Sequence, residues 1–286
     1  MNDKSFVRVL RFPVALIFVV ILCGAAFSQD GSNLIREDGL LAVEMVEDEW
    51  SSTEIYRSGN PKERFYQVRV FEYQGRPLFV FFGAIFETDE INIYIVEYDG
   101  ALILKSRVPY TRGTGYYFDN SSNIRMRDGT IYFFIDREYT GSAIDLNTGE
   151  VTLGDDFPFE KKPAFQSEFT SPGGARRVKV GTISLTVVDN STGDETVLFE
   201  QPYSGSWSIG QIVWADDEVF YFDNSGAVAC IWKVDLLDMT LSKVVPEHSA
   251  RNPYYFVGDR GAFVAYIEGN YIRIAYPEKI AYPEKS

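Results

Sequence analysis

The sequence predicts an all-β fold, a β-propeller of four-stranded blades. Two observations predict it: a hairpin turn recurs about every 44 residues, and the strands beside each turn are rich in β-branched and aromatic residues. The recurring turns contain Asp-Gly or a related pair, at Asp38-Gly39, Gln74-Gly75, Asp128-Gly129, Gly173-Gly174, Asp216-Asp217 and Arg260-Gly261. A spacing of about 44 residues is the usual length of one propeller blade, so the repeat indicates a ring of blades.

A second turn recurs in the other half of each unit. These turns contain Asp, Asn or Gly, around Gly100, Gly149, Gly193 and Asp238. All three residue types can adopt the positive φ angles of tight hairpin turns. Each unit therefore reads strand, turn, strand, loop, strand, turn, strand.

The strands that follow four of these first turns are almost continuously apolar. The clearest examples are Leu78–Phe82, Ile131–Ile135, Val219–Phe222 and Ala262–Ile267. A strand that is buried on both faces has this composition. We therefore expect these segments to be interior strands of their blades.

Six blades are predicted, with five as the alternative, because the chain after residue 28 contains just under six units of about 44 residues. The last unit supplies only three strands, near Tyr254–Val257, Ala262–Ile267 and Tyr271–Tyr276, before Pro277, which ends a strand. We predict that part of Asn33–Val46 supplies the fourth strand. Pairing of the N- and C-terminal strands would then close the ring.

The first 28 residues have the pattern of a secretory signal peptide. Three basic residues precede the apolar run Phe12–Leu22, and Ala26-Phe27-Ser28 places small residues where a signal peptidase cleaves. We therefore predict a signal peptide at 1–28, a single propeller domain at 29–276 and an extended tail at 277–286. The predicted location is secreted or periplasmic.

A membrane anchor is the alternative, through an uncleaved leader or a lipidated Cys23. The apolar stretch Phe12–Phe27 is shorter than the roughly 20 residues of a spanning helix, so we expect no stable membrane span after cleavage. The chain has 27 Lys and Arg against 41 Asp and Glu, a formal charge of -14. So acidic a protein is not expected to bind nucleic acid.

Few residues offer catalytic or metal chemistry. The chain has one histidine, His248, and beyond the leader one cysteine, Cys230, in an apolar run that favours a core thiol. Zinc sites of several histidines or thiolates are therefore excluded. The acidic segment Asp189–Glu195 lacks the spacing of a calcium loop and is interpreted as a hairpin turn. We predict no catalytic residue, no metal and no cofactor.

The repeat resembles the blades of secreted β-propellers, most closely the six-bladed TolB-like group, from about Asn33 to Tyr276. The resemblance extends to the fold alone, because such folds carry binding scaffolds, lyases and hydrolases. It implies that the loops opposite the hairpin turns gather around a central channel, where propellers bind ligands. The candidate ligand-binding residues in these loops are Tyr110, Arg112, Asp136, Arg137, Trp207, Asp223, Asn224, His248 and Arg251.

Two functions follow from this face. The first is a non-enzymatic, extracytoplasmic binding or scaffold protein, with a protein or an envelope polymer as its partner. The alternative is a glycan-active enzyme, a lyase or a hydrolase, that uses acids and tyrosines of the same face, since the chain contains 18 tyrosines.

Overall fold

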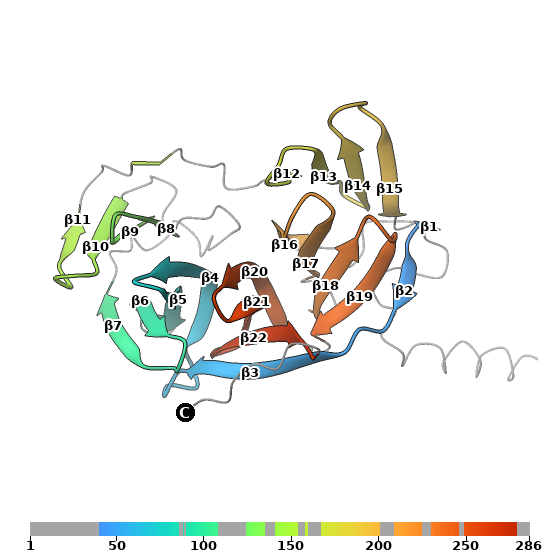
Figure 1. Cartoon of the computed structure of the whole chain (residues 1–286). Coiled ribbons are helices and arrows are strands. Elements are labelled where there is room, and N and C mark those ends of the chain that lie inside the picture. Colours follow the sequence, from blue (N-terminus) through green and yellow to red (C-terminus); the bar gives the residue numbers. More distant parts are fainter. Residues whose placement is uncertain are drawn as a thin grey trace, which may run out of the picture.

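The computed structural model describes residues 40–85, 88, 90–107, 124–134, 141–153, 158–159, 167–200, 209–224, 230–245 and 249–278. These residues form an all-β structure of five sheets in a propeller-like arrangement (Figure 1), and none of them is helical. Each sheet is built on four antiparallel strands, as the sequence predicts.

The sheets are numbered I to V in chain order. Sheet I contains β4 (Arg64–Tyr73), β5 (Arg76–Ile85), β6 (Glu90–Glu97) and β7 (Leu102–Arg107). Sheet II contains β8 (Ile124–Arg127), β9 (Thr130–Phe134), β10 (Gly141–Asp145) and β11 (Val151–Leu153). Sheet III contains β12 (Glu168–Thr170), β13 (Arg176–Val180), β14 (Ser184–Asp189), β15 (Glu195–Glu200) and the short β1 (Leu40–Leu41).

Two sheets complete the arrangement. Sheet IV contains β16 (Ile209–Trp214), β17 (Val219–Asn224), β18 (Cys230–Asp235), β19 (Thr240–Val245) and the parallel β2 (Glu44–Val46). Sheet V contains β20 (Ala250–Gly258), β21 (Gly261–Glu268), β22 (Tyr271–Pro277) and β3 (Trp50–Arg57). In Figure 1 the first strand of each sheet faces the middle of the arrangement and the last strand lies at its periphery.

The predicted hairpin turns are present wherever the structure describes them. Gln74-Gly75 joins β4 to β5, and Asp128-Gly129 joins β8 to β9, with positive φ at all four residues. Asp38-Gly39 lies outside the described residues. In sheets I to IV the turns between first and second strands and those between third and fourth strands lie at the same end, here called the hairpin end, and the β20–β21 turn of sheet V corresponds to them. The opposite end is called the loop end.

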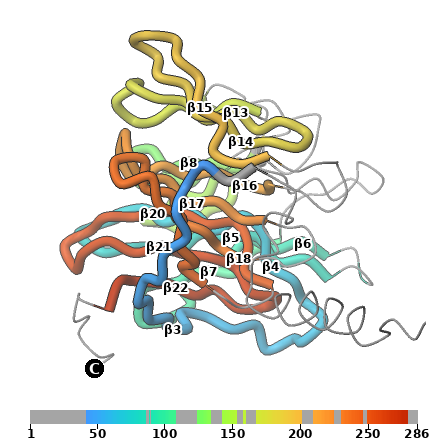
Figure 2. The backbone as a smooth tube through the Cα atoms, turned by 90° about the vertical axis from the view of Figure 1, so that its right-hand side faces the viewer, coloured from blue at the N-terminus to red at the C-terminus, as the bar shows by residue number. Residues whose placement is uncertain are grey.

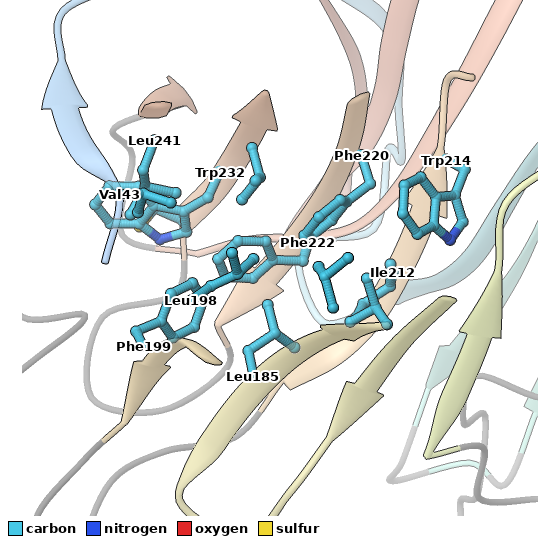
Figure 3. Packing of buried hydrophobic residues seen from close by; sticks show 14 residues of the cluster. Val43, Leu185, Leu198, Phe199, Ile212, Trp214, Phe220, Phe222, Trp232 and Leu241 are labelled. Carbon is cyan, nitrogen blue, oxygen red and sulfur yellow. The ribbon is translucent and has the colours of Figure 1, made fainter. Parts of the chain in front are cut away.

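The second strands β5, β17 and β21 are buried on both faces along most of their length, as their composition predicts, whereas β9 and β13 have half-buried residues beside their buried ones. All residues of β5 from Leu78 to Ile85 are buried, and so are five of the six residues of β17. The sheets are held together by side chains that pack between them. Figure 3 shows the cluster between sheets III and IV, where Leu185 and Phe199 meet Phe222 and Trp232.

Similar clusters join sheets I and II, IV and V, and V and I. The last of these places the C-terminal sheet against the first one. Ile55 and Ile272 of sheet V share this cluster with Phe65 and Phe79 of sheet I. The first and last sheets of the chain are therefore in contact.

The N-terminal segment 40–57, here called the strap, runs along the outer edges of three sheets. Its strand β1 pairs with β15, β2 pairs with β19, and β3 pairs with β22. In Figure 2 the strap is the blue tube that follows one side of the molecule. The strap therefore supplies the missing fourth strand of sheet V.

The strand that does so is not the one predicted. Trp50–Arg57 pairs with the C-terminal strand, whereas the described part of Asn33–Val46 lies on sheets III and IV. Alternating burial in β3, with Ile55 buried between two exposed or half-buried neighbours, fits the peripheral strand of a sheet. The strand β22 ends at Pro277, as expected.

Candidate functional site

Arginine and tyrosine side chains gather on the first strands of sheets I, II and V, which face the middle of the arrangement. Arg69 lies on β4, Arg125 on β8 and Arg251 on β20. Arg69 is 3% exposed, and Arg125 and Arg251 are half-buried. Three positive side chains on inner strands contrast with the acidic composition of the whole chain.

Arg69 lies beside Tyr254 of β20, and the strand β8 that carries Arg125 contacts the strand β4 that carries Arg69. The guanidinium carbon of Arg69 is 5.3 Å from the centre of the Tyr254 ring, a cation–π distance. Its Nη1 donates a hydrogen bond of 2.7 Å to the carbonyl oxygen of Val68. Burial lowers the pKa of Arg69 to about 10, and the positive charge of Arg125 contributes to the lowering. Burial also lowers the pKa of Arg125.

The two guanidinium groups therefore repel each other in a partly desolvated setting. Among the described residues, no carboxylate lies within ion-pair distance of Arg69 or Arg125. A buried positive charge needs a partner or a hydrogen-bonded network to offset its loss of solvation. In the described part of the chain, that offset comes from the Val68 carbonyl and the Tyr254 ring.

A second arginine–tyrosine pair lies nearer the loop end. The guanidinium carbon of Arg251 is 5.1 Å from the centre of the Tyr66 ring, and its Nη2 lies 3.4 Å from the Phe65 carbonyl oxygen. Arg251 is the second residue of β20 of sheet V, whereas Tyr66 belongs to β4 of sheet I. This contact spans the junction between the last and first sheets.

Asp223 holds two inner strands together. Its Oδ1 accepts a hydrogen bond of 2.6 Å from the backbone N–H of Gln211 on β16, and its Oδ2 accepts one of 2.7 Å from Asn252 on β20. The side chain is 1% exposed, and burial raises its pKa despite these bonds and the nearby Arg251. Asp223 therefore connects sheet IV to sheet V.

Backbone irregularities make this arrangement possible. The pairing register shifts between Ile209 and Ile212 on β16, and between Arg251 and Tyr254 on β20. Asn252 has a φ of 53°, which turns its N–H toward Asp223. At Gly210 a Cβ would lie 2.7 Å from Asp223 Oδ1, so a side chain there would displace the carboxylate. Such bulges commonly redirect backbone groups next to functional sites.

Three of the nine predicted site residues are described. Asp223 and Asn224 are buried at the loop end of β17, and Arg251 is half-buried at the loop end of β20. The structure thus brings Asp223 close to the chain at Arg251, because Asp223 accepts a hydrogen bond from the N–H of the next residue, Asn252. The others lie outside the described residues, namely Tyr110, Arg112, Asp136, Arg137, Trp207 and His248.

Sequence reasoning missed Arg69, Arg125, Tyr66 and Tyr254, because it searched loops and not strands. One signal was present: Arg69 interrupts the apolar run between Val68 and Val70 in a strand that is otherwise suited to a core. A charged residue inside a buried strand requires a specific partner or a role in binding.

A cleft of about 320 Å³ lies at the hairpin end, between sheets I and V. Its walls include Phe256 and Phe263, and Arg260 lies 5.0 Å from the centre of the Tyr98 ring. Several acids line its rim, namely Glu72, Glu97, Asp99 and Asp259. The cleft contains none of the sequence-predicted site residues.

The acidic turn and the cysteine lie as interpreted from the sequence. Asp189 Oδ1 accepts hydrogen bonds from the backbone N–H groups of Ser191 and Thr192, within an exposed hairpin turn. Cys230 is a buried free thiol whose pKa burial raises to about 11. Within the described ranges, no group of His, Cys, Asp and Glu could hold a metal ion. Nor do these ranges contain a helix long and apolar enough to cross a membrane.

No model of a protein family and no curated protein matches the chain. Among solved structures, the chain is similar to the extracellular domain of a B. thetaiotaomicron protein described as a hybrid two-component system. The two are 12% identical in sequence, with a TM-score of 0.34. The alignment covers 88% of this chain and 43% of the other, so the chain spans less than half the length of that structure.

Proposed function

We propose that the protein is an extracytoplasmic, non-enzymatic binding protein that recognises a protein or an envelope polymer at the loop end of a propeller. In this proposal the five sheets are five blades, and the pairing of β3 with β22 closes the ring. The packing of sheet V on sheet I supports closure. The leader-like residues 1–28 support export.

The observation that carries the proposal is the pair Arg251 and Tyr66 at the loop end of sheets V and I. Both side chains are half-buried, and the guanidinium carbon of Arg251 is 5.1 Å from the centre of the Tyr66 ring. The two residues belong to the last and the first sheet of the chain. Arginine and tyrosine are the residue types that contribute most to binding at interfaces. A preorganised pair loses little conformational entropy when a partner binds.

The test is capture of partners from an envelope extract by the purified protein without its leader. We expect the double variant Arg251→Ala, Tyr66→Ala to lose the captured protein or polymer. The matched control is Arg260→Ala, which removes an arginine from a similar pair with Tyr98 at the hairpin end. Capture that survives the double variant, or that is lost in the control alone, would contradict binding at the loop end.

The alternative of a glycan-active enzyme would need a carboxylate that can reach a substrate. Asp223 is 1% exposed, and both of its oxygens already accept backbone hydrogen bonds. The alternative therefore depends on Asp136, which lies outside the described residues. Turnover of a polysaccharide panel that disappears in Asp136→Asn would favour it over the binding protein.

A further inference from the structure

We propose that Arg125, Arg69 and Tyr254 form a binding site for an oxyanion, the carboxylate or phosphate group of a ligand. The inference rests on the proposed binding function and names the chemistry that the site recognises. Its residues come from the first strands of sheets II, I and V, which face the middle of the arrangement (Figure 1).

The site contains two positive charges in a partly buried setting. Arg69 is 3% exposed, and its neighbour Arg125 is close enough to disfavour its charged form. Arginine stays protonated at neutral pH even with a pKa of about 10, so both groups carry their charge. Two desolvated positive groups side by side are unfavourable until a negative charge joins them.

The described surroundings supply only weak compensation. The hydrogen bond to the Val68 carbonyl engages one of the donors of Arg69, and the Tyr254 ring offers a cation–π contact. A guanidinium has five N–H donors in a planar fork that matches the oxygens of a carboxylate or phosphate. An oxyanion would add a negative charge next to these guanidinium groups and could accept charge-assisted hydrogen bonds from them.

The exposure of the three residues assigns their roles. Arg125 and Tyr254 are half-buried, so they can contact a ligand directly. Arg69 lies deeper and adds positive potential behind them. The chain has a formal charge of -14, so the positive potential at this site is opposite in sign to that of the molecule as a whole.

The experiment measures thermal unfolding of the protein without its leader, with added sodium phosphate or sodium glucuronate. Sodium chloride at equal ionic strength and glucose are the references. Phosphate stabilises many proteins without specific binding, so the readout is the difference between variants. We expect the wild type to be stabilised by at least one oxyanion, because a ligand that binds only the folded state raises its stability.

The variant Arg125→Ala should weaken oxyanion binding about 10- to 100-fold, as expected for loss of charge-assisted hydrogen bonds. The matched control is Arg127→Ala on the same strand, where Arg127 is exposed and lies 3.7 Å from Asp128. This control should bind like the wild type. Stabilisation by phosphate alone or by glucuronate alone would identify which anion the site prefers.

A second variant, Arg69→Met, separates a binding role from a structural one. If Arg69 is held for a ligand, its replacement by an apolar side chain of similar length should raise the melting temperature without ligand and abolish the oxyanion effect. A structural arginine would give the opposite result, a lower melting temperature and an unchanged oxyanion effect.

Three outcomes would overturn the inference: no oxyanion stabilises the wild type beyond the chloride reference, Arg125→Ala responds like the wild type, or Arg69→Met keeps the oxyanion effect. The partner-capture test remains informative in each case. Capture that depends on Arg251 and Tyr66 without any oxyanion binding would preserve the proposed function and remove this site. Oxyanion binding without any capture of a partner would preserve this site and remove the proposed function.

Discussion

Replacement of Ile55 by alanine tests whether the strap is an integral part of the fold. Ile55 lies on β3, is 3% exposed and belongs to the cluster between sheets V and I. Large-to-small changes at such positions cost about 2–5 kcal/mol, from lost burial and the cavity that remains. Each 1 kcal/mol shifts the melting temperature of a domain of this size by about 2–4 °C, so Ile55→Ala should lower it by about 4–20 °C.

The assay is urea unfolding followed by tryptophan fluorescence and circular dichroism, with the two signals compared for a single transition. The control is Met45→Ala on β2, which removes a side chain of similar size that is 44% exposed on the same strap. It should cost less than about 0.5 kcal/mol, as surface substitutions usually do. A loss below about 1 kcal/mol for Ile55→Ala, or equal losses for both variants, would refute the view that β3 joins the two sheets.

Three further predictions follow from single side chains. Gly100→Ala should destabilise the protein more than Gly149→Ala, and equal unfolding midpoints would contradict this. Both glycines have positive φ, but only at Gly100 would a Cβ meet another atom, the Ile55 carbonyl oxygen at 2.5 Å. Asp223→Ala should cost about 2–6 kcal/mol in chemical denaturation because two buried N–H groups lose their acceptor, and a cost near zero would show that water replaces it. The thiol of Cys230 is buried and its pKa is raised to about 11, so in the folded protein lacking its leader it should not react with a thiol reagent at pH 8. It should react fully in guanidinium, and rapid reaction of the folded protein would show that the thiol is accessible.

The repeating part of the fold could be predicted from the sequence because its signals are local. Gly75 and Gly129 mark turns that require positive φ, and continuous apolar runs such as Leu78–Phe82 mark strands buried on both faces. The fourth strand of sheet V is predicted too close to the N-terminus, because Trp50–Arg57 contains Ser, Thr and Glu and has little apolar character. Its partner lies more than 200 residues away, and pairing at that separation leaves no local pattern.

The candidate site could be predicted only at its loop end, for a similar reason. Arg251 was found because it follows a loop, whereas Arg69 and Arg125 lie within strands. Which strand of a sheet faces the middle depends on how the sheets pack, and composition does not contain that information. The role of Asp223 depends on two bulges, at Gly210 and Asn252, that the sequence pattern does not reveal.

The strap also sets an order of events during synthesis. Its three strands are made before any of their partners, which lie at residues 195–200, 240–245 and 271–277. A hydrogen bond from Ser51 to Glu278 joins positions 227 residues apart. The strand β3 must therefore wait unpaired until almost the whole chain has emerged, and such non-local pairing is slow and exposes strands to wrong partners. A nascent chain halted before residue 271 would contain β20 and β21 of the last sheet but not β22, the strand with which β3 pairs.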